Sequence, residues 1–179
     1  MKKLLVKNVQ NVSKDCVVCG THNKFSLCTK FFECEGDVLL GVVSGAEHHQ
    51  SYPGRMHGGM ISAIIDEAVG RAVQIGNPDI WGVTGELKIR YLKPTPLGEE
   101  LHCFSKLTQN NSRLFKGVAI LETQSGELVA TGEATYFKMS IDKIAQDFGE
   151  DDWFFEHGLH VPETVVIHND EALEKLCNK

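Results

Sequence analysis

The stretch HGGMISAIIDEAVG at 57–70 constrains the fold more than any other part of the chain. Two glycines open it, and apolar side chains then follow on nearly every side of a helix as far as Val73. A helix that is apolar almost all round must be covered by other elements on most of its surface. Asp66 lies among these apolar side chains. We therefore expect a buried central helix over 57–75 in which Asp66 is paired, desolvated or used in chemistry.

Strand-like segments flank this helix on both sides in the sequence. Two precede it, and Glu35-Gly36-Asp37 between them predicts a β-hairpin. Four follow it and are predicted to form a meander, because Pro, Gly or Asn marks each connection. Since hairpin-linked strands pair antiparallel, we expect an α+β fold in which about six strands curve around one helix. The predicted strands are 25–35, 38–44, 82–93, 99–109, 112–123 and 127–138.

The two ends of the chain have weaker patterns. Apolar spacing predicts a short helix over 1–15. Near the other end we expect burial of the aromatic run 153–155, a short strand at 161–167 and a short helix at 170–177. The extension is predicted to pack over the sheet or over a neighbouring subunit. The predicted segments are a lead-in at 1–24, a helix-and-sheet domain at 25–139 and an extension at 140–179.

The charge composition of the chain argues against nucleic-acid and membrane partners. The net charge is −6 and no Lys/Arg-rich block is present, so we expect neither nucleic acid nor a membrane as a partner. No apolar run approaches the ~20 residues of a membrane span. The apolar start of the chain breaks at Lys7, which is too early for an export signal. The six cysteines show no disulfide-dense pattern, so free thiols and a cytoplasmic location are expected.

One cysteine pair has the spacing of half a zinc site. Cys16 and Cys19 are separated by two residues, and His22, Cys28 and Cys34 follow nearby. No second pair has zinc-ligand spacing, so the sequence predicts neither a metal nor another cofactor. A serine hydrolase is also disfavoured, because the chain lacks a Gly-x-Ser-x-Gly elbow.

Together these segments resemble the hotdog-fold thioesterases, specifically the PaaI-type (phenylacetate-pathway) acyl-CoA thioesterases of the 4-hydroxybenzoyl-CoA thioesterase superfamily. The matching segments are YPGRMHGG at 52–59, Asp66-Glu67, GVTGELKIRYLKP at 82–94 and LGE at 97–99. CVVCG at 16–20 is similar to a lead-in found in one branch of that family. The resemblance covers residues 16–138. It implies hydrolysis of an acyl- or aryl-CoA by a homodimer or a dimer of dimers.

Thioester hydrolysis needs donors for the developing oxyanion and a base or nucleophile for the attack. A helix N-terminus presents free N–H groups, and Gly58 and Gly59 leave room for a carbonyl beside them. The resemblance implies that the Gly58 amide is the oxyanion donor and that Asp66 is the base or nucleophile. Asp66 lies eight residues further on, about 12 Å along the helix axis. Since both groups must lie within roughly 3.5 Å of one carbonyl, we expect Asp66 of one protomer to face Gly58 of another.

Two neighbours of Asp66 on the helix also enter the predicted site. Ser62, one turn earlier, could hydrogen-bond the Asp66 carboxylate. Glu67 has the i, i+4 spacing for an ion pair with Arg71, and a catalytic or substrate-binding role for Glu67 is the alternative.

Four further residues are placed near the substrate by the resemblance. Thr84 matches a hydroxyl that helps hold the attacking water, although strand alternation puts Thr84 on the polar side of 82–93. Some relatives carry an Asn six residues before His57; here that position is Ser51, with Gln50 beside it. His57 is expected to cap the helix or to line the pocket. Candidates for the CoA phosphates, by charge alone, are Lys88, Arg90, Lys93, Arg113 and Lys116.

Two other functions stay open. A hotdog dehydratase or hydratase, a lyase, carries a His-x-Pro-Gly loop and an acid nearer the helix start. Here the loop reads SYPG at 51–54, and the corresponding helix residues Ala63 and Ile64 are apolar. A non-catalytic acyl-CoA sensor would need a DNA-binding segment, and 1–15 is too short for a helix-turn-helix. The acid at Asp66 favours catalysis over both alternatives.

Overall fold

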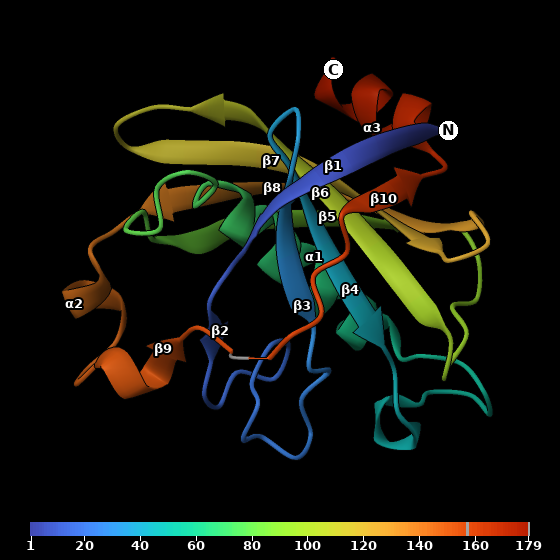
Figure 1. Cartoon of the computed structure of the whole chain (residues 1–179), viewed down its shortest axis with the longest axis horizontal. Helices are drawn as coiled ribbons and strands as arrows, with labels where there is room; N and C mark the ends of the chain where they lie inside the picture. The colour runs from blue at the N-terminus through green and yellow to red at the C-terminus, as the bar shows by residue number, and fades with distance from the viewer. Residues whose placement is uncertain (157, 179) are drawn as a thin grey trace.

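The computed structural model describes residues 1–156 and 158–178 of the chain. Its central element is α1 (Gly58–Ala72), which packs against a curved antiparallel sheet (Figure 1). His57 is the N-cap of this helix, and Gly76, with a φ of +70°, lies in the turn beyond its end. The α+β architecture with one long central helix is therefore confirmed.

The sheet is larger than the six strands expected. Within the described residues, eight strands lie in the order β10-β1-β3-β4-β6-β7-β8-β5. A separate two-stranded sheet pairs β2 (Val12–Ser13) with β9 (Trp153–Phe154). The strands of the large sheet are β1 (Lys2–Val9), β3 (Lys30–Cys34), β4 (Val38–Ser44), β5 (Gly82–Tyr91), β6 (Glu100–Asn110), β7 (Leu114–Thr123), β8 (Leu128–Lys138) and β10 (Thr164–Ile167).

The predicted four-strand meander is wrong for its first pair of strands, β5 and β6. Strands β6, β7 and β8 do pair in sequence, but β5 pairs with β8 at the far edge instead of with β6. Strand β6 already has two neighbours, because β4 pairs with it from Val38 opposite Lys106 to Ser44 opposite Glu100. Strand β5 therefore pairs with the free edge of β8. The connection at 92–99 contains two prolines and crosses from the edge of the sheet to its middle.

The N-terminal segment is a strand, so the predicted helix over 1–15 is wrong. Strand β1 pairs with β10 from the other end of the chain and with β3. Leu4 is buried while Leu5 is exposed, which is the alternation of a strand. The pairing partners are far apart in sequence, so local spacing gave no signal for them.

The first predicted strand, 25–35, begins later than expected. Only β3 (Lys30–Cys34) is regular, because the preceding residues pair with a turn. Leu27 N–H donates to Val17 O at 2.9 Å, and Thr29 N–H donates to Val18 O at 2.8 Å. This pairing fixes the turn that carries Cys16 and Cys19 beside the sheet.

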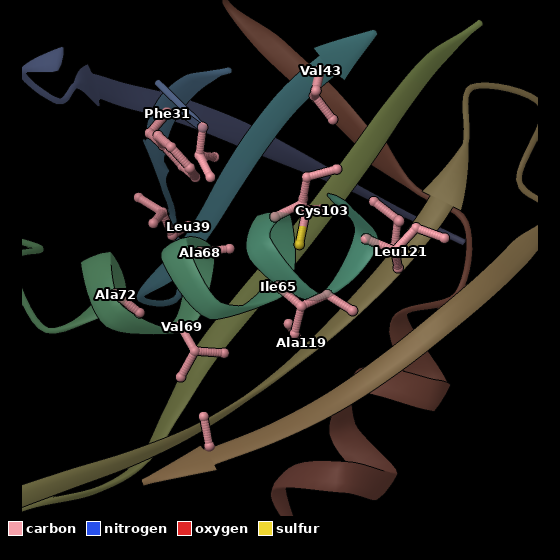
Figure 2. Close-up of a cluster of buried hydrophobic side chains, with 14 of the residues drawn as sticks. Phe31, Leu39, Val43, Ile65, Ala68, Val69, Ala72, Cys103, Ala119 and Leu121 are labelled. Atoms are coloured by element: carbon pink, nitrogen blue, oxygen red, sulfur yellow. The ribbon is translucent and has the colours of Figure 1, made fainter. Parts of the chain in front are cut away.

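The main core lies between α1 and the inner face of the sheet. Ile65, Ala68 and Val69 of the helix point toward buried side chains of the strands (Figure 2). Strand β4 also contributes to a second core on the outer face, which explains why its sequence is apolar on both sides. Labelled members of the inner core on the strands are Phe31, Leu39, Val43, Cys103, Ala119 and Leu121.

The C-terminal extension packs over the outer face of the sheet. Strand β10 extends the sheet beside β1, and α3 (Asp170–Cys177) covers the outer core through buried Leu173 (Figure 1). Both elements agree with the strand and helix expected there. The segment boundaries at 24 and 139 stay a prediction. The remaining short helices are η1 (Glu47–His49), α2 (Ile141–Ile144) and η2 (Glu150–Asp152).

The aromatic run near the C-terminus is only partly buried. The Trp153 ring lies 5.1 Å from the Trp81 ring and 4.4 Å from the Arg71 guanidinium carbon, whereas Phe155 is 46% exposed. All six cysteines are free thiols. Among the helices of the described residues, none combines the length and apolarity that a membrane crossing requires.

Candidate active site

The N-terminus of α1 forms one half of the candidate site. The His57 side chain accepts a hydrogen bond from Gly59 N–H, with 2.9 Å between Nδ1 and N. That bond uses the Gly59 donor, whereas the Gly58 N–H has no acceptor within residues 1–156 and 158–178. An unsatisfied N–H at a helix N-terminus lies at the positive end of the helix dipole. Gly58 is therefore the better-placed anion donor of the two glycines.

Tyr91 of β5 fixes the first turn of this helix. Its hydroxyl donates to Gly58 O at 3.0 Å and lies 2.6 Å from Ser62 Oγ. A Cβ added at Gly58 would meet only the Tyr91 ring, at an ordinary 3.5 Å. Packing within the protomer therefore does not require glycine at this position. Glycine does leave the space beside the Gly58 N–H open for a ligand.

The acid in the middle of the helix forms the other half. Asp66 Oδ1 accepts a hydrogen bond from Thr84 Oγ1 at 3.0 Å, and the Tyr136 hydroxyl lies 2.5 Å from both this oxygen and the Asp66 backbone carbonyl oxygen. Burial of Tyr136, followed by the negative charge of Asp66, raises the pKa of this phenol well above its usual range. Tyr136 is therefore a hydrogen-bond donor at any working pH. A cavity of about 200 Å³ opens over Asp66, Thr84 and Tyr136.

Thr84 reaches Asp66 because β5 is irregular beside it. The pairing of β5 with β8 shifts register between Thr84 and Glu86, so the bulge at Gly85 interrupts the alternation. The prediction that Thr84 points to the polar side with its neighbours is therefore wrong. Thr84 shares the helix-facing side with Leu87 and Ile89, which pack against the inner core.

The two neighbours of Asp66 on the helix have other partners. Ser62 pairs with Tyr91, so the alternative in which Ser62 holds the Asp66 carboxylate is wrong. Glu67 Oε1 accepts from Arg71 Nε at 2.7 Å, which confirms the expected i, i+4 pair. Glu67 also lies beside the thiols of Cys16 and Cys19.

The loop before the helix places its candidate residues at the surface. Gln50 Oε1 accepts from Gly54 N–H at 2.8 Å, so this side chain holds the loop. Ser51 is exposed, and its N–H donates to Arg55 O at 2.9 Å. No contact in the described residues joins either side chain to Asp66 or Gly58. Of the predicted cations, Lys88, Arg90 and Lys116 line hollows on the outer face beside α3.

Two tyrosines complete the geometry and were missed by sequence reasoning. Tyr91 and Tyr136 each lie on a predicted strand, but the residues they bind are distant in sequence. The one available signal for Tyr136 is the run of small inward residues before it on β8, Ala130, Gly132 and Ala134. Such residues let a helix approach a sheet closely, which brings a following tyrosine within reach of that helix.

A long helix cradled by a curved antiparallel sheet, with a glycine N-terminus and a hydroxyl-bound acid, defines a hotdog-fold protein. The family model described as Thioesterase superfamily matches residues 53–130, a range that contains Gly58, Asp66 and Thr84. Residues 53–130 of the chain are therefore similar to the thioesterase superfamily, in agreement with the resemblance of its sequence.

Individual relatives agree with this assignment. Mouse acyl-coenzyme A thioesterase 13 is 28% identical over 98 residues, which are 54% of this chain and 70% of that protein. A solved thioesterase superfamily protein has a TM-score of 0.63 and 26% identity, over 70% of this chain and 64% of its own. The likeness thus spans less than two thirds of that solved chain. The PaaI protein of E. coli shares the fold, with a TM-score of 0.58 and 14% identity over 64% of this chain and 81% of its own. The name of the mouse relative supports the prediction of a thioester hydrolase.

Proposed function

We propose that this protein is an acyl-CoA thioesterase that hydrolyses an acyl- or aryl-CoA to the free acid and CoA. The observation that carries the proposal is the combination of an open N–H donor at Gly58 with a carboxylate at Asp66 that two hydroxyls orient. The name of the mouse relative, acyl-coenzyme A thioesterase 13, supports the same substrate class.

In the proposed reaction the thioester carbonyl oxygen accepts a hydrogen bond from Gly58 N–H. Negative charge grows on this oxygen as the tetrahedral intermediate forms, and the positive end of the α1 dipole stabilises it. The missing side chain at Gly58 lets the carbonyl approach this N–H. His57 keeps the Gly59 N–H occupied and holds the backbone of the first turn in place.

Asp66 drives the attack by one of two routes. As a general base it takes a proton from a water whose oxygen bonds to the carbonyl carbon; the C–S bond then breaks, and the sulfur of CoA leaves and takes up a proton. As a nucleophile its carboxylate attacks the carbon first; the C–S bond breaks, CoA leaves as a thiolate that takes up a proton, and water hydrolyses the resulting anhydride to the free acid and Asp66. Thr84 and Tyr136 donate to Oδ1, which leaves Oδ2 for the reacting water or carbon.

Two protomers are needed for one complete site in this proposal. Gly58 and Asp66 are eight residues apart on one helix, about 12 Å along its axis, so one copy cannot bring both to one carbonyl. The half-exposed side chains of Met60 and Ala63 on α1, together with the edge strand β5, offer a surface for a second copy. A homodimer, or a dimer of dimers, would place Asp66 of one helix opposite Gly58 of the other.

Thiol release from a panel of acyl- and aryl-CoAs tests this function. We expect hydrolysis of at least one substrate, and a fall in kcat of about 100-fold or more for Asp66→Asn. The amide of the variant still accepts hydrogen bonds from Thr84 and Tyr136, so the helix should stay folded. Unchanged kcat in Asp66→Asn would contradict the role of this acid. Tight binding without hydrolysis of any substrate would instead indicate a non-catalytic acyl-CoA binding protein.

A further inference from the structure

A group of sulfur and oxygen atoms lies beside the candidate active site but has no part in the proposed reaction. The thiols of Cys16 and Cys19 and the carboxylate of Glu67 lie within 4.8 Å of one another. The cysteines come from the turn after β2, and Glu67 comes from α1. Cys19 is fully buried, and Cys16 and Glu67 are partly buried. The fold therefore supplies the third ligand that the sequence pattern did not reveal.

The distances between these atoms suit a tetrahedral zinc-like ion. Glu67 Oε1 lies 3.5 Å from Cys19 Sγ, and Glu67 Oε2 lies 3.9 Å from Cys16 Sγ. Zinc–sulfur bonds of ~2.3 Å and zinc–oxygen bonds of ~2.1 Å at a tetrahedral angle put sulfur and oxygen about 3.6 Å apart. The two distances involve different oxygens of Glu67, so one cation would contact all three residues after a rotation of the carboxylate.

Backbone N–H groups donate hydrogen bonds to the sulfurs of both cysteines. Cys16 Sγ accepts from the N–H groups of Val18 at 3.2 Å and Cys19 at 3.5 Å. Cys19 Sγ accepts from Ser13 N–H at 3.4 Å. Hydrogen bonds to the ligating sulfur are the outer contacts that orient metal-binding thiolates. Each sulfur thus accepts hydrogen bonds from backbone N–H groups and also faces the Glu67 carboxylate.

Arg71 holds the group together and balances its charge. Its guanidinium donates to Glu67 Oε1 at 2.7 Å and lies 2.9 Å from Cys19 Sγ. The guanidinium is clamped between the rings of Phe31 and Trp153, at 4.7 and 4.4 Å from their centres. Two thiolates and one carboxylate carry three negative charges, and Arg71 offsets one of them. The remaining charge matches one divalent cation.

We propose that Cys16, Cys19 and Glu67 form a binding site for one thiophilic divalent cation of the zinc class. The two thiolates and one carboxylate supply three ligands, and a water completes the tetrahedron. Arg71 is the outer residue that orients Glu67. The bound ion ties the turn at 16–19 to α1, one residue from Asp66, and so stabilises the helix that carries the proposed site.

Zinc titration of the full chain tests the site without any substrate. The reduced protein is stripped with a chelator and then titrated with Zn²⁺ against a chromogenic competitor. We expect one Zn²⁺ per chain, and a higher Tm with the metal than without it. Titration with Co²⁺ is expected to give thiolate-to-metal charge-transfer absorption and the visible bands of a tetrahedral ion.

Substitutions assign the ligands. Glu67→Gln keeps the side-chain volume and is expected to weaken Zn²⁺ binding on the order of 100-fold, and Cys16→Ser to weaken it further. Cys177→Ser, a half-buried thiol on α3, is the matched control and should bind as wild type. Circular dichroism checks that each variant is folded. Absence of stoichiometric Zn²⁺ binding to the wild type, or equal affinity in folded Glu67→Gln, would overturn the proposal. Since the readout is metal content, either result leaves the thioesterase proposal standing.

Discussion

The phenol of Tyr136 on β8 lies 2.5 Å from Oδ1 of Asp66 in the middle of α1, across 70 residues of sequence. The Tyr136 ring is itself stacked on Phe115, with 4.8 Å between ring centres and 1° between ring planes. The inner face of the sheet thus positions the acid of the central helix. A polar side chain in this apolar helix is accommodated because two hydroxyls satisfy it.

Removing the Tyr136 hydroxyl should slow the reaction without preventing substrate binding. Tyr136→Phe keeps the stacked ring but deletes one donor to a charged acceptor, so we expect kcat to fall about 10-fold while KM changes little. Steady-state kinetics with the best acyl-CoA substrate measures both values. A normal kcat in this variant, or a change confined to KM, would show that Tyr136 does not position the acid.

Thr84 should behave as the second donor to the same carboxylate. Thr84→Val matches the shape of threonine but lacks the hydroxyl, and we expect kcat to fall about 10-fold. Thr84→Ser is the matched control, because it keeps the hydroxyl and should retain most of the activity. Comparison of kcat for the two variants checks the hydrogen bond itself. Equal loss in both variants would mean that strand packing, rather than the hydroxyl, matters here.

The N-terminal strand predicts opposite outcomes for two adjacent leucines. Leu4 is 2% exposed in the outer core, whereas Leu5 is 55% exposed. Leu4→Ala should lower the free energy of unfolding by about 2–5 kcal/mol. Leu5→Ala should change it by less than about 0.5 kcal/mol. Urea unfolding followed by circular dichroism measures both. Similar losses for the two variants would contradict the strand.

The fold could be predicted where local pattern and tertiary environment agree. The helix from 58 to 72 and the strands β4, β6, β7 and β8 could be predicted because each is an apolar or alternating run bounded by turn residues. The prediction errors arise where pairing with strands distant in sequence determines the structure of a segment. Strand β1 is specified by β10 and β3, and the place of β5 is decided by which strand edge is still free. No local spacing carries that information.

In the site, too, residues on one element could be predicted from the sequence, whereas contacts between distant elements could not. Gly58, Gly59 and Asp66 lie on one helix, so their spacing could be predicted from the sequence alone. Thr84 could be singled out only by resemblance, since the bulge at Gly85 reverses the direction that alternation predicts. Tyr136 reaches the same carboxylate from β8, and the small inward residues before it are the one local signal of that close approach.

Mixing two inactive variants tests most directly whether each active site takes residues from two protomers. Asp66→Asn lacks the acid, and Gly58→Val fills the space in front of the N–H donor; each variant alone should be inactive. A mixed dimer pairs the intact Gly58 of one copy with the intact Asp66 of the other and so rebuilds one site. After unfolding and joint refolding in equal amounts, random pairing should restore roughly a quarter of the wild-type activity. Activity no higher than that of the separate variants, with mixed dimers confirmed by mass spectrometry, would contradict a site shared between protomers.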